Sequence, residues 1–167
     1  VSDYGYGAAA PEIARDLIAE ARRRGLTITL DSRYRLLRYP GVTAATPNEP
    51  EVEEVIARAI GDDLGALEGG GREVLARLQA QAVVVTRGSK GMALFERDRP
   101  MELIPVFGSD EIADVTGAGD TVIAVFTLAL AAGATFSEAS HLANMAGGMV
   151  VMKMGTAAVS LDELEAA

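Results

Sequence analysis

The sequence contains no cysteine and only one histidine, His141. Disulfides and metal sites built on thiolates are therefore excluded. With no partner cluster around it, the histidine is expected on a helix surface or partly buried rather than as a catalytic base. Basic residues are also scarce relative to acidic ones, and the formal net charge is −9. This charge argues against general binding to nucleic acid or to an anionic membrane, and it means that an anionic substrate must be held by local features.

The sequence also lacks a hydrophobic run long enough for a membrane span. The uncharged stretch from Thr121 to Ser137 is interrupted by Gly133. Its helical part, which ends at Ala132, would be only about 18 Å long at 1.5 Å per residue. We therefore expect a buried core helix here. Residues 1–10 include an acidic side chain and no basic one, so they do not read as a signal peptide, and we expect a cytoplasmic protein.

The length and composition are enough for one hydrophobic core, because the chain has 167 residues and is 49% hydrophobic. Short apolar segments alternate with amphipathic ones, which predicts a three-layer, doubly wound α/β domain with a mostly parallel sheet and an antiparallel hairpin. The expected helices are Pro11–Arg24, Asn48 to about Ile60, Arg72–Gln79, Thr121–Ala132 and Phe136–Met154. The expected strands are Leu26–Leu30, Val42–Ala45, Ala82–Val85, Met92–Glu96 and Glu102–Phe107.

Three finer expectations concern burial and connections. The glycine-rich segment 65–71 is expected to be a loop between two helices. The first helix is expected to bury one apolar face, formed by Ile13, Leu17, Ile18 and Ala21. The methionines of the last long helix are expected to fill the core, and these are Met145, Met149, Met152 and Met154.

The turn from Asp114 to Asp120 leads directly into the apolar helix. Gly117 and Gly119 have no Cβ and tolerate unusual backbone angles, so an anion can approach the backbone closely. The first N–H groups of a helix lack intrahelical acceptors and attract phosphate. A carboxylate is not needed to bind an anion, so Asp120 is a candidate to handle a hydroxyl proton. The alternative is that Asp120 only complements the helix dipole.

Two nucleotide-binding patterns are excluded at this turn. The dinucleotide fingerprint requires a third glycine where Val122 stands. The Walker pattern requires Gly-Lys-Ser/Thr, which neither this turn nor the segment Gly88–Gly91 supplies.

A second informative segment is a capping box, in which Asn48 is the N-cap of a helix and Glu51 its third residue.

The turn from Asp114 to Asp120 resembles the closing signature of the ribokinase-like (PfkB) sugar kinases. The longer run Asp114–Ser160 is most similar to the kinase domain of heptose-7-phosphate kinases. Three further segments match the family in the same order, and these are Ser2-Asp3-Tyr4-Gly5, Asn48 with Glu51, and Thr86 to Gly91. The family's Lys-Gly is replaced here by Tyr6-Gly7, so a cation that could face a phosphate is missing from this loop.

The resemblance implies phosphoryl transfer from Mg²⁺-ATP to a sugar hydroxyl. Asp120 would act as the base, and the amides of Gly117, Ala118 and Gly119 would form an anion hole for the transferring phosphate. The favoured acceptor is heptose 7-phosphate. Ribose, fructose and fructose phosphates remain open as acceptors, and so does a non-catalytic nucleotide-binding module.

The resemblance also implies a nucleotide site. Asn48 and Glu51 would organise water and Mg²⁺ around the phosphates, and Asn144 would contact the nucleotide. Residues that would line the phosphates are Thr86, Gly88 and Gly91. A K⁺ ion would be held by Asp114 and the carbonyl group of Thr116.

The resemblance covers only the second half of such a kinase. In the family, the N-terminal half supplies most of the sugar pocket, the lid and the dimer contact. This chain is therefore expected to bind nucleotide but to phosphorylate sugar poorly by itself. The partners implied are nucleotide and a sugar or sugar phosphate, a second copy in a full-length homodimer, and a fused nucleotidyltransferase domain.

Overall fold

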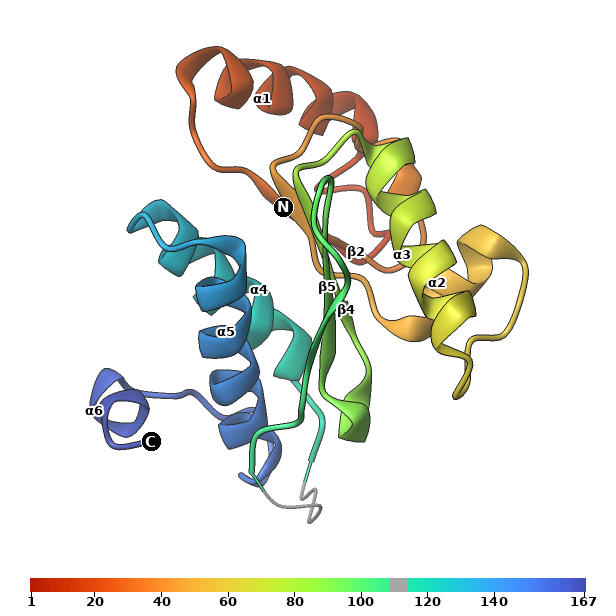
Figure 1. Ribbon diagram of the computed structural model, residues 1–167. Helices are drawn as coiled ribbons and strands as arrows, with labels where there is room; N and C mark the ends of the chain where they lie inside the picture. The colour runs from red at the N-terminus through yellow and green to blue at the C-terminus, as the bar shows by residue number, and fades with distance from the viewer. Residues whose placement is uncertain (109–113) are drawn as a thin grey trace.

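The computed structural model describes residues 1–108 and 114–167 (Figure 1). Within these residues, six strands form one sheet whose spatial order equals the chain order. The strands are β1 (Ser2–Asp3), β2 (Thr29–Ser32), β3 (Ala44–Ala45), β4 (Ala82–Thr86), β5 (Met92–Glu96) and β6 (Glu102–Ile104). Strands β1 to β4 are parallel, whereas β5 and β6 are each antiparallel to the strand before them. The predicted mixed sheet with an antiparallel hairpin is thus confirmed.

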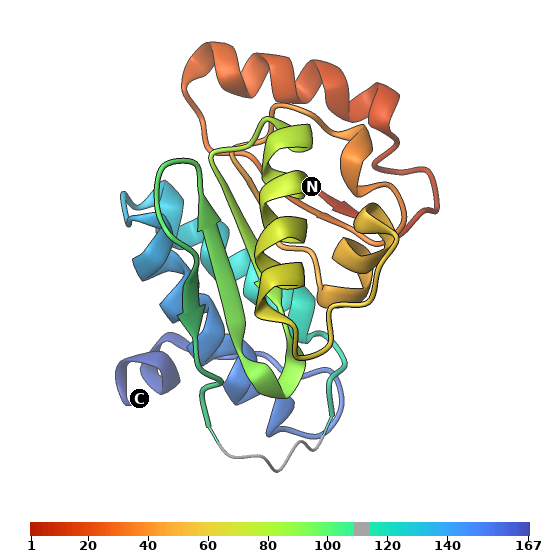
Figure 2. The same cartoon turned by 45° about the vertical axis from the view of Figure 1, so that its right-hand side comes forward.

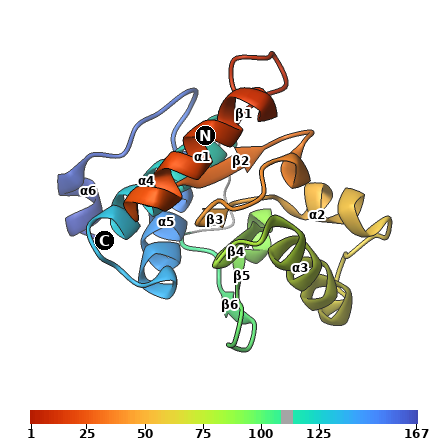
Figure 3. The ribbon, with the colours of Figure 1, turned by 90° about the horizontal axis from the view of Figure 1, so that it is seen from above.

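Helices cover both faces of the sheet (Figures 2 and 3). They are α1 (Pro11–Arg24), α2 (Glu49–Ile56), α3 (Leu64–Leu78), α4 (Ala118–Ala131), α5 (Phe136–Val151) and the short α6 (Leu161–Glu165). Side chains of α1, α2 and α3 share one buried cluster, and those of α4 and α5 share the other. Strand β4 serves both clusters because its side chains alternate: Val83 and Val85 face the first and Val84 faces the second.

The local signals for helix ends are confirmed where they are strong. Helix α1 begins at Pro11 and ends at Arg24, followed by Gly25 in the left-handed region with φ of 67°. The predicted capping box at Asn48 is present, but α2 ends at Ile56 instead of continuing to Ile60. A second capping box, between Thr135 and Glu138, opens α5.

The glycine-rich segment 65–71 was wrongly expected to be a loop, because it forms the first half of α3. Asp63 caps this helix through the amide of Ala66. A Cβ on Gly71 would lie 2.4 Å from the ring of Phe95, and one on Gly70 would lie 2.7 Å from Val52. These glycines therefore let the helix approach its neighbours closely, and packing outweighs their low helix propensity.

The expected apolar face of α1 is partly wrong. Ala14, Ile18 and Ala21 are buried, whereas Ile13 is 64% and Leu17 is 56% exposed. The buried residues and the exposed residues both recur at helical spacing. The way in which α1 packs against the rest of the chain therefore decides which of the two faces is buried. Two of the methionines expected in the core are also exposed, namely Met152 and Met154.

Helix α4 is less buried than the sequence indicates. Val122, Ile123, Phe126 and Ala129 face the core, but Leu128 is 70% exposed. Among the described residues, no helix is both long and apolar enough to cross a membrane.

Candidate active site

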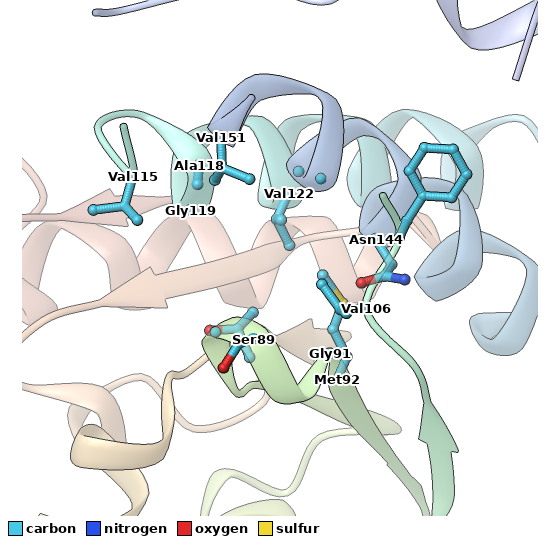
Figure 4. A pocket seen from close by; sticks show the side chains of 15 residues that line it. Ser89, Gly91, Met92, Val106, Val115, Ala118, Gly119, Val122, Asn144 and Val151 are labelled. Carbon is cyan, nitrogen blue, oxygen red and sulfur yellow. The ribbon is translucent and has the colours of Figure 1, made fainter. Parts of the chain in front are cut away.

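Two adjoining cavities lie where the parallel strands end and α4 begins. One is apolar, with a volume of about 190 Å³, and Asn144 and Val122 contribute to its walls (Figure 4). The other is more polar, with a volume of about 590 Å³. Thr86, Val115 and Gly119 line both cavities, so the two are parts of one groove. The carboxyl ends of parallel strands are the usual ligand-binding edge of such sheets.

The start of α4 opens into this groove. Gly117 is the N-cap with φ of 81°, and no described side chain caps the first turn. Gly117 and Gly119 line the polar cavity, and Ala118 and Gly119 line the apolar one. The Ala118 amide donates to the carbonyl oxygen of Val115 at 3.2 Å. An anion between the cavities would meet a helix N-terminus that no described side chain caps by a hydrogen bond.

Asp120 lies in the first turn of α4, and its side chain lines the polar cavity. The hydroxyl of Tyr4 lies 2.9 Å from each of its carboxylate oxygens. Tyr4 belongs to the loop after β1, so this contact joins residues 116 positions apart. Asp120 is thus held at the wall of an open cavity.

Besides Asp120, three acidic residues line the polar cavity, namely Asp3, Asp31 and Glu51. Asp31 lies in β2, and its pKa is raised by burial and then by the nearby charge of Asp120. Burial raises the pKa of Glu51 to about 7; hydrogen bonding from Asn48 opposes this rise, and the charge of Asp31 adds to it. Burial and the neighbouring acidic groups disfavour additional negative charge in this cavity, whereas Arg33, which also lines it, favours such charge.

Asn48 and Glu51 are brought to the polar cavity by the capping box itself. The Asn48 amide donates to Glu51 Oε2 at 3.0 Å, and the Glu51 amide donates to Asn48 Oδ1 at 2.9 Å. Within the described residues, no cluster of three or more acidic or imidazole groups could hold a metal ion by protein ligands alone. Glu51 and its neighbours supply oxygen ligands, which suit Mg²⁺ when phosphate oxygens complete its coordination.

The last residue of β4 is hydrogen-bonded to the segment just before α2. Thr86 pairs with Asn48 as an isolated parallel bridge, and its amide donates to the carbonyl oxygen of Pro47 at 2.9 Å. Gly91 has φ of 78°, and a Cβ there would lie 2.0 Å from the Ile104 carbonyl oxygen, so only glycine fits. Thr86, Gly88 and Gly91 all line the apolar cavity.

The remaining residues singled out in the sequence differ in their placement. Asn144 lines the apolar cavity, but its side-chain nitrogen already donates to the Pro105 carbonyl oxygen at 2.8 Å. Thr116 lines the polar cavity. Asp114 accepts a hydrogen bond from the Thr116 amide at 2.9 Å, and hydrogen bonds from Thr116 lower its pKa.

Several cavity residues were missed by sequence reasoning. Asp31 could have been found from its place in a parallel strand near the carboxyl edge, whereas the contact of Tyr4 with Asp120 has no local signal. The hydroxyl of Thr46 is buried at the polar cavity without a hydrogen-bond partner among the described residues. Arg35 does not line the polar cavity, and its guanidinium group pairs with the buried Asp3.

Comparison with known proteins gives consistent results. The profile of the pfkB family carbohydrate kinases matches residues 14–164. The bifunctional protein HldE of Gluconacetobacter diazotrophicus is 40% identical over 165 residues, which are 98% of this chain and 34% of that protein. The chain therefore spans about a third of the length of this relative.

Solved structures share the fold. Arabidopsis thaliana ribokinase complexed with ribose and ATP superposes with a TM-score of 0.83 at 21% identity, over 94% of this chain and 52% of that one. Phosphofructokinase-2 from Escherichia coli, in complex with substrates and products, superposes with a TM-score of 0.80 at 21% identity, over 99% of this chain and 53% of that one. The chain thus corresponds to about half of each structure.

Proposed function

Because the chain belongs to the pfkB family of carbohydrate kinases, we propose that it is the nucleotide-binding and base-carrying part of an ATP-dependent sugar kinase. One observation carries this proposal: the open N-terminus of α4 lies at the junction of an apolar and a polar cavity, with Gly119 in both. This arrangement suits a nucleotide whose base occupies the apolar cavity and whose phosphates reach the helix start. The acceptor sugar then lies in the polar cavity beside Asp120.

In this mechanism the sugar hydroxyl oxygen attacks the γ-phosphorus of ATP, and the bond from that phosphorus to the β–γ bridging oxygen breaks. Asp120 accepts the hydroxyl proton, and ADP leaves. Amides of Gly117, Ala118 and Gly119 stabilise charge on the phosphoryl group. A loose transition state demands positioning of the reacting groups more than basicity of the proton acceptor.

The other cavity residues support the nucleotide. Thr86 lines both cavities and would lie beside the phosphates. Gly88 and Gly91 would border the path of the phosphates from the apolar cavity, where Asn144 borders the adenine. Mg²⁺ would be held through water by Glu51 beside Asn48, and it would neutralise phosphate charge when bound. K⁺ would lie at Asp114 and the Thr116 carbonyl group.

For the acceptor we propose heptose 7-phosphate, because the run Asp114–Ser160 resembles heptose kinases and the similar HldE protein is bifunctional. The second activity of a bifunctional HldE protein is consistent with a nucleotidyltransferase domain fused to the kinase. We place the enzyme in the cytoplasm and expect a homodimer in the full-length protein. A nucleotide-binding module without catalysis is the second candidate, because Tyr6-Gly7 stands where the family has Lys-Gly.

The experiment is Asp120→Asn in the full protein that contains this chain. We expect kcat for phosphoryl transfer to fall about 10²- to 10⁴-fold while the Kd for ATP stays within twofold. Asp16→Asn is the matched control, because the Asp16 side chain is 82% exposed on α1. Undiminished transfer by Asp120→Asn would refute the assignment of the base. No transfer by the unaltered protein with any sugar phosphate would favour the binding module.

A further inference from the structure

Tyr4 makes a contact with Asp120 that the proposed mechanism does not yet use. Its phenolic hydroxyl lies 2.9 Å from both Oδ1 and Oδ2. A phenol carries a single proton, so this is one hydrogen bond shared between two acceptors. Among the described side chains, Tyr4 is the hydrogen-bond donor to this carboxylate. The orientation of Asp120 in the cavity is therefore set by this residue.

Tyr4 itself is held in place by the residue before it. Asp3 is only 2% exposed and accepts hydrogen bonds from the Gly5 amide and from Ser32 and Tyr39 hydroxyls. The guanidinium group of Arg35 also pairs with it. These contacts hold the pKa of Asp3 well below its usual range, which keeps it ionised and the network intact. The loop carrying Tyr4 is thus anchored to β2 and the segment after it.

A second acidic residue, Asp31, lies near the carboxylate that Tyr4 contacts. The Asp31 carboxyl group lies in the same cavity, and its Oδ2 comes within 4.0 Å of the position that a Cβ on Gly119 would take. The charge of Asp120 raises the pKa of Asp31, so the two carboxyl groups repel each other when both are ionised. The hydrogen bond from Tyr4 fixes the Asp120 carboxylate against this repulsion and leaves other lone pairs free to accept from a sugar hydroxyl.

We propose that Tyr4 is a positioning residue, whose hydroxyl holds the Asp120 carboxylate with an oxygen facing the attacking sugar hydroxyl. This role rests on the proposed kinase function. Tyr4 lines only the polar cavity, so its effect belongs to the acceptor side and not to nucleotide binding. The pKa of Tyr4 is raised, first by its hydrogen bond to Asp120, so the phenol remains a donor at neutral pH.

Kinetics on the full protein that contains this chain test the role. Tyr4→Phe keeps the ring and removes the hydroxyl, and we expect kcat to fall about tenfold while KM for ATP changes less than twofold. Tyr6→Phe is the matched control, because Tyr6 lies in the same loop and is 94% exposed. Equal kcat for Tyr4→Phe and the unaltered protein would overturn the positioning role and leave the kinase function standing.

A spectroscopic titration tests the contact without any turnover. With ¹³C-labelled tyrosine rings, the Tyr4 signal is expected to titrate at lower pH in Asp120→Asn than in the unaltered protein, while Tyr6 is unchanged. An unchanged Tyr4 titration would overturn the contact whatever the activity. Absence of transfer in the unaltered protein, with the Tyr4 shift observed, would instead overturn the kinase function and, with it, the positioning role.

Discussion

At the scale of single residues, the acidic side chains near the polar cavity differ in how their surroundings treat charge. Asp3 is stabilised as an anion by Arg35 and three further donors. Glu51 is affected in the opposite direction, because burial raises its pKa to about 7. Its protonated form is therefore favoured in the folded chain, and ionising it costs folding free energy unless a cation enters the cavity.

This difference predicts the effect of Glu51→Gln on stability. Below the unfolded pKa of about 4.5 both states hold the proton, so Glu51 has no effect there. Between that value and about 7 the unfolded chain loses its proton first, so stability falls as pH rises. Without Mg²⁺, Glu51→Gln should raise Tm by roughly 2–4 °C at pH 8, after allowing for partial solvent access. At pH 4 it should have no effect.

The matched control is Glu138→Gln, which occupies the same position of the capping box on α5. Hydrogen bonds from Thr135 lower the pKa of Glu138, so its replacement should not stabilise the chain at pH 8. Thermal unfolding followed by circular dichroism at both pH values measures each variant. Equal Tm values for Glu51→Gln and the unaltered chain at pH 8 would contradict the raised pKa.

At the scale of elements, α3 shows how packing overrides helix propensity. Gly69, Gly70 and Gly71 stand in one turn, which should weaken a helix. Gly70 and Gly71 face Val52 and Phe95, respectively, at distances that leave no room for a Cβ. A Cβ on Gly69 would meet nothing within 4 Å. The glycines are thus required on one side of the helix and dispensable on the other.

This asymmetry predicts opposite effects for two alanine substitutions. Gly71→Ala forces the Phe95 ring to move in a packed core and should lower the free energy of unfolding by about 1–2 kcal/mol, even after the gain in helix propensity. Gly69→Ala should raise it by up to about 1 kcal/mol. Urea unfolding measures both variants. Stabilisation by Gly71→Ala would show that the helix does not lie against Phe95.

At the scale of the whole molecule, the groove is assembled from distant parts of the sheet. Its walls come from the loop after β1, from β2, from the segments after β3 and β4, and from the start of α4. Apolar side chains remain exposed on α1 and α4, including Ile13, Leu17 and Leu128. The chain corresponds to about half of each solved kinase, and we propose that a further part of the kinase completes the sugar pocket.

The prediction is that the 167-residue chain alone transfers phosphate at least about 100-fold more slowly than a protein that also carries that further part, because the acceptor is neither positioned nor shielded from water. ATP binding should be retained, because the apolar cavity is formed within this chain. Coupled ADP-release assays measure the first quantity and calorimetry the second. Comparable turnover by the two proteins would contradict the proposal that this chain is half of the enzyme.

The features determined by the sequence alone are short-range. The limits of α1, the capping boxes at Asn48 and Thr135, and the glycine turn into α4 each depend on residues within a few positions of one another. The α/β fold class was predicted from the alternation of short apolar segments with amphipathic ones. The family was predicted from motifs that occur in the same order as in its members.

Only the tertiary structure decided which side of α1 is buried, why α3 tolerates its glycines, and which residue holds Asp120. Each of these depends on a surface supplied by a distant segment. The hydrogen bond from Tyr4 to Asp120 spans 116 positions, and neither residue carries a local signal for the other. Folding brings the loop after β1 to the start of α4, and this approach places Tyr4 beside Asp120 in the polar cavity.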